Sequence, residues 1–275
     1  MDNNPPIMLT PADFTDTGQW RLIIYISHSG MRAFLIHISD KSHPIVRLLA
    51  TNWPADDPAS LLNNIESAIY DNPRLLDDYA TDVIIETSQV CFVPNNFILS
   101  VEDAESIVFS SLFPGEAKEI LSDTTDDVTA LFSMTRGLDG FIARTMPGAR
   151  LRSHLAVLIE NFRKITTADS PAVYADIRDS ELDLILFKGK DLISASVQKW
   201  HSPEDIAYRI FNMLNAYSIN PVLTKVFLSG LQKPVDALRE TVSGYFSDLQ
   251  PTPLPANPGG DDPLPPAALL LAFRK

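Results

Sequence analysis

The stretch PAVYADIRDSELDLILFKGKDLISASVQKW, residues 171–200, decides the fold of this chain. It contains three short runs rich in Val, Ile, Leu, Tyr and Phe, a composition typical of β-strands. Polar turns containing Asp, Ser, Gly or Lys separate these runs. The pattern predicts a three-stranded meander with strands at Ala172–Ala175, Leu182–Phe187 and Leu192–Val197, and turns at Asp176–Glu181 and Lys188–Asp191.

A similar order of elements occurs about 150 residues earlier. Each meander ends in a tryptophan, Trp53 or Trp200, and is followed by a capping residue and a proline, which predicts a helix start. A further apolar strand follows each helix. The matches together predict a duplicated β-β-β-α-β unit. Its remaining segments are strands Arg21–Ile26, Arg32–Ile38, Ile45–Ala50, Thr81–Thr87 and Thr224–Ser229, and helices that begin at Asp57-Pro58 and Ser202-Pro203.

The segment between the repeats has mixed patterns, and the chain ends in a proline-rich stretch. We predict strands at Cys91–Ile98 and Ala130–Met134, helices at Glu102–Leu112, Leu138–Met146 and Ser153–Ile165, and a loop at Leu121–Asp127. Seven of the sixteen residues from Pro251 to Pro266 are proline, which is typical of an extended connector. The apolar segment Ala267–Phe273 is expected to pack back onto the protein. We therefore expect an α/β protein with a first domain over 1–165 and a second over 166–275.

Composition excludes several classes of function. The 275 residues carry a formal net charge of −13, and such an acidic surface repels nucleic-acid backbones. The single cysteine, Cys91, makes no internal disulfide, and we expect it to be buried. No apolar run is long enough to span a membrane as a helix, and the N-terminus lacks the pattern of a signal peptide. We expect a soluble cytoplasmic protein.

Three segments carry a resemblance to a known family: RLIIYISHSGMRAFLIH at 21–37, CFVPNNF at 91–97 and VYADIRDSELDLILFKGKDLI at 173–193. With the duplication, they resemble the actin-like ATPases, whose fold consists of two ribonuclease-H-like domains. More narrowly, the chain looks like domain-of-unknown-function family 3822. The resemblance implies two mixed sheets facing each other across a cleft. The cleft would be lined by Ser27, His28, Ser29, Asp176, Arg178, Asp179 and Gly230.

The resemblance also implies a site for ATP and Mg²⁺ in active members, but the corresponding turns are altered here. Ser27 is interpreted as the replacement for the aspartate of the first turn, and Arg178 takes the glycine position of the second. Asp179 and Glu181 add negative charge where phosphate would lie. Only Gly230 remains of a pair of glycines on the adenine side. We therefore expect no catalytic residues, no cofactor and no ATP hydrolysis.

Two functions of different classes stay open. The first is a non-catalytic adaptor, a pseudo-ATPase that binds a protein partner. The second is a nucleotide-binding ATPase or kinase-like enzyme, in which Asp176 would organise the metal and Arg178 would contact phosphate. Each site residue also has a structural interpretation. Asp176 would bond its own turn, Arg178 and Asp179 would be a solvated loop, Gly230 would permit a tight turn and His28 would be exposed. The oligomeric state is not readable from these residues.

Overall fold

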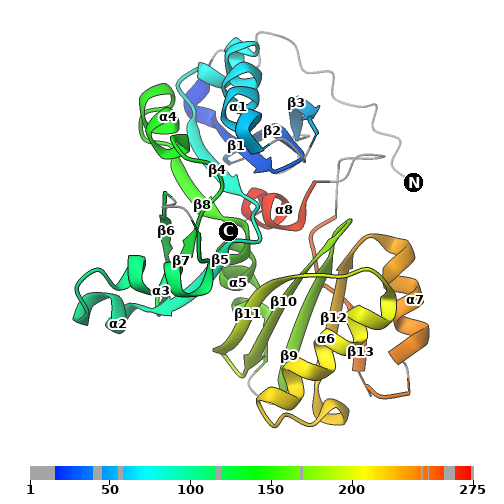
Figure 1. The fold of residues 1–275 in the computed structure, drawn as a ribbon. Helices are drawn as coiled ribbons and strands as arrows, with labels where there is room; N and C mark the ends of the chain where they lie inside the picture. The colour runs from blue at the N-terminus through cyan, green and yellow to red at the C-terminus, as the bar shows by residue number, and fades with distance from the viewer. Residues whose placement is uncertain are drawn as a thin grey trace, which may run out of the picture.

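The computed structural model describes residues 16–39, 45–54, 58–115, 119–167, 170–242, 244–246, 248–256 and 264–273. Within these ranges the protein has two five-stranded mixed sheets, one in each half of the chain, and a smaller three-stranded sheet (Figure 1). Four short 3-10 helices accompany them at Thr17–Gln19, Pro58–Ser60, Pro73–Leu76 and Pro221–Leu223.

The first sheet has the strand order β3-β2-β1-β4-β8. Strands β1, β2 and β3 form an antiparallel meander, and β4 and β8 continue the sheet in parallel with β1. Helix α1 (Leu61–Tyr70) connects β3 with β4 and buries Leu61, Ile65 and Ile69 on one face. The strands are β1 (Trp20–Ser27), β2 (Gly30–His37), β3 (Val46–Asn52), β4 (Ala80–Ile85) and β8 (Arg150–Ser153).

The second sheet repeats the same order and strand directions, β11-β10-β9-β12-β13. Helix α6 (Pro203–Ala216) is the counterpart of α1 and buries Ile206, Ile210 and Leu214 at the same four-residue spacing. Ser202 caps α6 by accepting a hydrogen bond from the Asp205 amide at 3.3 Å, as predicted. The predicted cap Asp57 lies outside the described residues. The other elements are β9 (Pro171–Ile177), β10 (Glu181–Lys188), β11 (Asp191–Lys199), β12 (Lys225–Gly230), α7 (Gln232–Val242) and β13 (Asp248–Pro251).

The segment between β4 and β8 contains an inserted unit with its own sheet, and here the sequence prediction was partly wrong. The segment predicted as one strand over Cys91–Ile98 ends its strand at Pro94 and continues as a short helix. The predicted loop at Leu121–Asp127 begins with a strand, which was not predicted because its sequence, LSDT, is mostly polar. The unit consists of β5 (Val90–Pro94), α2 (Asn95–Ser100), α3 (Ala104–Leu112), β6 (Leu121–Thr124) and β7 (Val128–Phe132), followed by α4 (Leu138–Thr145).

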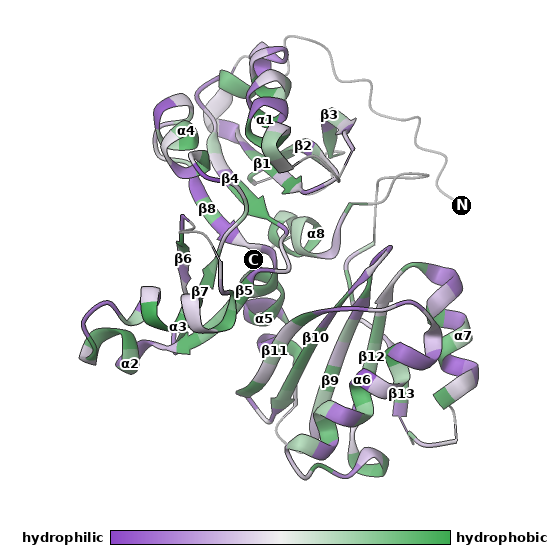
Figure 2. Cartoon of the chain, viewed as in Figure 1, coloured by the Kyte–Doolittle hydropathy of each residue, from purple (hydrophilic) through white to green (hydrophobic). Residues whose placement is uncertain are grey.

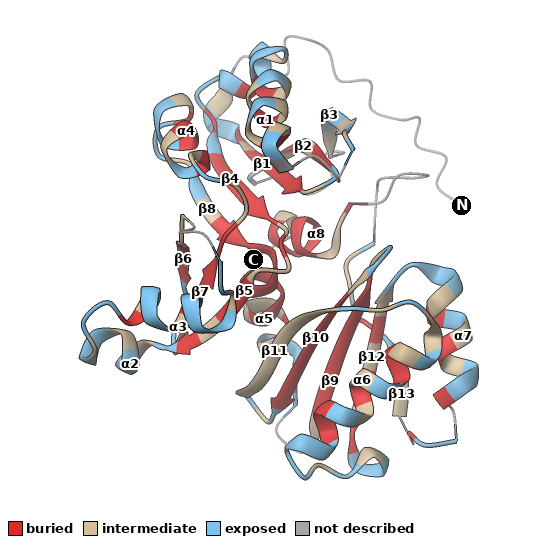
Figure 3. Cartoon of the chain, in the orientation of Figure 1, coloured by how far each residue is buried: buried red, intermediate tan, exposed pale blue. Residues whose placement is uncertain are grey.

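Helices α5 (His154–Ile165) and α8 (Pro266–Ala272) lie between the two halves (Figure 1). Residues 267–271 of α8 are all buried, so this apolar segment packs back onto the protein as expected. Helix α8 packs against α5 and β1, and α5 also contacts β10 and β11. The central strands of both large sheets are hydrophobic and buried, which places the main cores there (Figures 2 and 3).

The fold is thus the predicted α/β duplication, and the domain boundary at 165/166 stays a prediction. Among the described residues, no helix combines the length and the apolar composition that crossing a membrane requires. Cys91 is buried, as expected, and burial raises the pKa of its thiol to about 11.

Candidate functional site: the cleft between the two halves

Two equivalent hairpin turns face each other where the halves meet. In the first half, Ser27 pairs with Gly30 across the turn between β1 and β2. In the second half, the Arg178 amide donates to the Glu181 carbonyl at 2.9 Å across the turn between β9 and β10. Each turn therefore has two residues at its tip, and Ser27 and Arg178 occupy equivalent positions.

The pairing with the neighbouring parallel strand gives the same alignment. The amide of Glu86 donates to the carbonyl of Ile26, and the amide of Leu231 donates to the carbonyl of Ile177, both at 2.8 Å. Ile26 is thus equivalent to Ile177, and Tyr25 is equivalent to Asp176. The interpretation of Ser27 as the replacement for the aspartate was therefore wrong. A shift of two residues leaves the same side chains on each face of a strand, so the hydrophobic pattern does not reveal it.

Each tryptophan that ends a meander binds its turn, so the duplication extends to these contacts. The amide of Trp53 donates to the Ser29 carbonyl at 3.0 Å, and the amide of Trp200 donates to the Ser180 carbonyl at 3.2 Å. The Trp53 indole donates to the carbonyl of His28, and the Trp200 indole donates to that of Arg178, both at 3.0 Å. Both tryptophans pack against the cores. Their amides bind equivalent carbonyls, and their indoles bind different carbonyls of the two turns.

The cleft between these turns has a volume of about 720 Å³. Six of the seven predicted site residues line it, namely Ser27, Ser29, Asp176, Arg178, Asp179 and Gly230. The C-terminal connector and α8 close one side with apolar residues. The remaining lining residues are Tyr25, Arg32, Asn52, Trp53, Glu86, Ile177, Leu231, Leu254, Pro255, Leu264, Pro265, Pro266 and Leu269.

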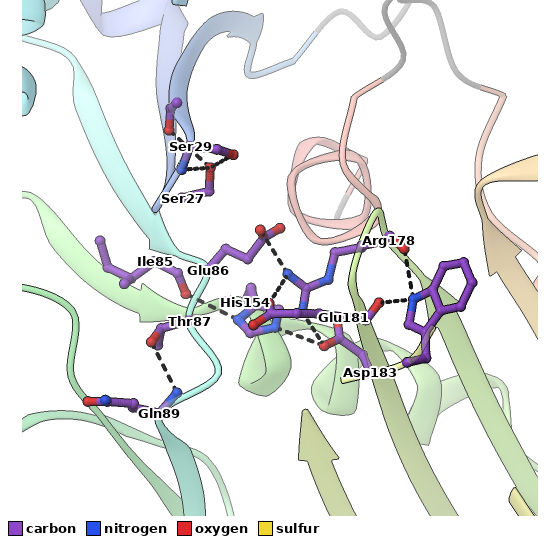
Figure 4. A network of polar contacts seen from close by, with 12 residues as sticks. Ser27, Ser29, Ile85, Glu86, Thr87, Gln89, His154, Arg178, Glu181 and Asp183 are labelled. Carbon is purple, nitrogen blue, oxygen red and sulfur yellow. Dashed lines mark hydrogen bonds and ion pairs between the residues drawn. The ribbon is translucent and has the colours of Figure 1, made fainter. Parts of the chain in front are cut away.

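Arg178 is the centre of an ion network that joins the two halves (Figure 4). One guanidinium nitrogen lies 2.8 Å from Glu86 of the first half and 3.1 Å from Glu181, and the other lies 2.6 Å from Asp183. The side chain is only 16% exposed, so Arg178 is not the solvated loop residue considered from sequence. Burial disfavours its charge, but the carboxylates outweigh burial and raise the pKa of Arg178 well above its usual value.

Tyr25 and His154 extend this network into β1 and α5. The Tyr25 hydroxyl donates to the carboxylate of Glu86. Burial and the neighbouring charge of Glu86 raise the pKa of Tyr25 well above its usual value, so the hydroxyl keeps its proton. One ring nitrogen of His154 lies 3.3 Å from Asp183 of the second half, and the other lies 3.2 Å from the Ile85 carbonyl of the first. Polar contacts thus run continuously from β1 to β10.

Asp176 and Asp183 lie directly opposite each other on β9 and β10. Both are buried, and each has one carboxyl oxygen without a hydrogen-bond partner among the described residues. Burial and the charge of Asp183 raise the pKa of Asp176 to about 6. Burial acts in the same direction on Asp183, but Arg178 and His154 outweigh it and lower its pKa to about 2. The interpretation of Asp176 as a turn residue bonded to its own backbone was wrong, because it lies within the strand.

The hydroxyl groups of Ser27 and Ser29 make their hydrogen bonds within the first turn. Ser27 Oγ donates to the Gly30 carbonyl at 3.2 Å and accepts from the Ser29 amide at 3.3 Å. His28 is half-buried and is not among the residues that line the cleft. Burial lowers the pKa of its ring, although Glu181 and Glu86 act in the opposite direction.

Gly230 is required by the backbone around it. Its φ is +97°, and a Cβ atom would lie 2.0 Å from the carbonyl oxygen of Ile177. Only glycine allows β12 to end this close to β9. The interpretation of Gly230 as a tight-turn residue accounts for it without any ligand.

The residues present do not fit a Mg²⁺–phosphate group. Arg178 fills the second turn and is already bound by three carboxylates, while Asp179 adds an exposed negative charge at the cleft. In the described part of the chain, no group of three or more His, Cys, Asp or Glu side chains is placed to hold a metal ion. Among the described residues that line the cleft, Asp176 has a buried oxygen without a hydrogen-bond partner, which favours a ligand with a hydrogen-bond donor.

Sequence reasoning missed the partners of Arg178. Tyr25, Glu86 and His154 are single polar or aromatic residues in or next to apolar strands. Glu86 contacts Arg178, Tyr25 contacts Glu86 and His154 contacts Asp183 only through the tertiary fold. The alternation along β10 places Asp183 on the face of Asp176, and this was the only local signal available.

Solved structures share this fold. A protein from Bacteroides thetaiotaomicron with an actin-like ATPase fold and unknown function is 18% identical to this chain, with a TM-score of 0.76. That match covers 87% of this chain and 93% of the other. The duplicated topology is therefore the actin-like ATPase fold, and identity this low extends the likeness to the fold alone.

Two other solved structures are more distant. The PilM–PilN type IV pilus biogenesis complex matches at 15% identity with a TM-score of 0.48, covering 92% of this chain and 98% of the other. The cytoplasmic domain of EpsL, an inner-membrane component of the type II secretion system of Vibrio cholerae, matches at 7% identity with a TM-score of 0.47, covering 92% of both chains. No curated protein matches this sequence. The family model described as Protein of unknown function (DUF3822) matches residues 10–249, and the chain therefore belongs to that family.

Proposed function

We propose that this protein is a non-catalytic interaction module that works in the cytoplasm by binding a protein partner. The observation that carries the proposal is the ion network of Arg178 with Glu86, Glu181 and Asp183. The guanidinium of Arg178 occupies the turn that phosphate would approach, and it binds carboxylates of both halves.

Charge supports this proposal. Phosphoryl transfer needs a metal, donors around the phosphates and a positioned nucleophile. The guanidinium of Arg178 is the strongest donor in the cleft, yet a phosphate would have to displace its three carboxylates. Freed carboxylates would then face the phosphate at short range, which is unfavourable in a partly buried site.

A nucleotide-dependent enzyme is the second candidate. It is favoured by the unpartnered Oδ1 of Asp176 beside a cleft of about 720 Å³. In that case the guanidinium of Arg178 would release its carboxylate partners and bind a phosphate of the nucleotide when the nucleotide enters the cleft.

A thermal-shift titration with Mg-ATP separates the two candidates. We expect no rise in Tm, and ATP hydrolysis no faster than in buffer. Asp176→Ala is the test variant, and Asp191→Ala, at the exposed first residue of β11, which does not line the cleft, is its control. A nucleotide-dependent rise in Tm that disappears in Asp176→Ala and persists in Asp191→Ala would support the nucleotide-dependent enzyme and contradict the adaptor. Arg178→Gly does not change the first turn, which has no carboxylate to organise Mg²⁺. We therefore expect that variant to lack ATP hydrolysis as well.

A further inference from the structure

A second open groove lies in the inserted unit, away from the cleft. Helices α2 and α3 project from the first half, and the unit has its own small core of Cys91, Val93, Phe109 and Leu131 (Figure 1). The groove between these helices has a volume of about 370 Å³, and we call it the α2–α3 groove. Its lining residues are Ile98, Val101, Asp103, Ala104, Glu105, Ser106 and Ile120.

The surface around the groove is apolar but not buried. Helix α2 has the sequence NNFILS and buries none of its residues (Figure 3). Leu99 is 87% exposed and Ile107 is 53% exposed, and they directly follow the lining residues Ile98 and Ser106 in the sequence. Apolar side chains clustered on an exposed surface are typical of a protein-binding site. Figure 2 shows hydrophobic segments in α2, at the tip of the inserted unit.

The charge around the groove restricts what can bind there. Asp103 and Glu105 line it, Glu102 is exposed next to them, and residues 95–115 contain no Lys or Arg. A second copy that docked through the same groove would bring the same acids against these acids, and each copy carries a formal charge of −13. Opposite charges across an interface favour encounter and like charges oppose it. The occupant is therefore basic, and it comes from a different protein.

We infer that the α2–α3 groove is the docking site for a basic amphipathic helix of a protein partner. The apolar face of that helix packs against Ile98, Val101 and Leu99, and its Lys or Arg side chains lie against Glu102, Asp103 and Glu105. A helix suits an open groove between two helices, because its apolar side chains recur on one face at three- to four-residue spacing. This inference rests on the proposed function, since it names where the partner binds and what kind of segment binds.

The test uses the full-length protein and three labelled synthetic peptides of about 18 residues, long enough to form a helix. The first is a Leu/Lys amphipathic helix. The second has Glu in place of Lys, and the third has the first composition rearranged so that no apolar face forms. Fluorescence anisotropy gives the Kd of each. We expect the first peptide to bind at least about tenfold more tightly than the other two, because binding needs both the apolar face and the positive charge.

Three double variants test the location of the site. Leu99→Ser combined with Ile107→Ser is expected to weaken the first peptide at least about tenfold, since exposed apolar side chains of α2 and α3 supply apolar contact area for the peptide. Val222→Ser combined with Leu223→Ser removes side chains that are 56% and 66% exposed in the second half, and is expected to leave Kd unchanged. Glu102→Gln combined with Glu105→Gln is expected to weaken binding and to flatten its dependence on salt.

Several results would overturn the inference. Absence of binding by the first peptide is one, and an equal loss in the Val222/Leu223 variant is another. Hydrogen exchange that shows protection at the cleft turns instead of α2 and α3 would place the peptide elsewhere. A dimer that dissociates in the Leu99/Ile107 variant would make a second copy the occupant. Failure here is distinguishable from failure of the proposed function, because Mg-ATP binding and hydrolysis are measured without the peptide.

Discussion

The β1–β2 turn and the β9–β10 turn are equivalent parts of the duplicated unit, yet they carry different side chains. Tyr25 and Arg32 face each other across the first hairpin, where Asp176 and Asp183 do so across the second. Glu86 follows the first parallel strand at the position of Leu231 in the second half. One backbone therefore presents an aromatic and a cation on one side of the cleft and two carboxyl groups on the other.

The difference shows how two copies of one unit became bound to each other. Neither half satisfies its polar groups alone, because Glu86 of the first half binds Arg178 of the second. Asp183 of the second half binds both Arg178 and His154. The two equivalent turns lie together, and their different side chains carry complementary charges. This asymmetry adds ion pairs to the shared hydrophobic core that also joins the halves.

Removing Arg178 gives the largest effect we expect. Arg178→Ala leaves Glu86, Glu181 and Asp183 without their shared cation, and loss of one member of a buried ion network costs about 3–5 kcal/mol. Ser27→Ala changes the equivalent position of the first turn, where the hydroxyl bonds only its own turn, and should cost about 1 kcal/mol. Urea unfolding followed by tryptophan fluorescence measures both. Equal costs at the two positions would show that the turns are energetically alike.

The end of the parallel strand is the next point of comparison. Gly230 has φ +97° and lies against Ile177, whereas the equivalent residue of the first half, Ile85, has a full side chain. Gly230→Ala should therefore lower the free energy of unfolding by about 2–4 kcal/mol through backbone strain and overlap. Gly244→Ala is the control, because a Cβ atom there meets nothing within 4 Å. A neutral Gly230→Ala would mean that β12 can move away from β9.

The fold could be predicted from sequence further than the site could. Apolar runs, turn residues, the two tryptophans and the Ser202 cap are local signals, and they were enough to predict the duplication. The strands β6 and β8 were missed because LSDT and RLRS lack the apolar alternation of a strand. The equivalence of Tyr25 with Asp176 depends on pairing between strands, which the period of two does not encode.

The two carboxyl groups of the second hairpin give a pH dependence that the first hairpin lacks. The pKa of Asp176 is raised to about 6 in the folded protein, so the fold keeps a proton that the unfolded chain loses near pH 4. The resulting stabilisation is fully present below pH about 4 and is lost as pH rises through about 6, a change of about 3 kcal/mol. Asp183 stays ionised throughout this window because its pKa is about 2.

Asp176→Asn is the variant that tests this dependence. The amide has the shape of the protonated carboxyl group and does not titrate, so the variant should be more stable than the natural protein at pH 7. It should also lose the decline between pH 4 and 6. Any slope that remains in the variant between pH 4 and 6 comes from groups other than Asp176. An unchanged slope would remove Asp176 from the explanation.

Tyr25→Phe tests the counterpart of Asp176 in the first half, and its effect is smaller than those of Arg178→Ala, Gly230→Ala and Asp176→Asn. The hydroxyl of Tyr25 donates to Glu86, which keeps its ion pair with Arg178 when the hydroxyl is removed. The cost should therefore be about 1.5 kcal/mol, that of one hydrogen bond to a charged group. Tyr208→Phe, at a side chain that is 62% exposed, should cost nothing measurable. If Tyr25→Phe costs more when Arg178 is also replaced, both residues stabilise the same carboxylate. Strictly additive costs would instead mean that the first turn contributes to the fold independently of the network.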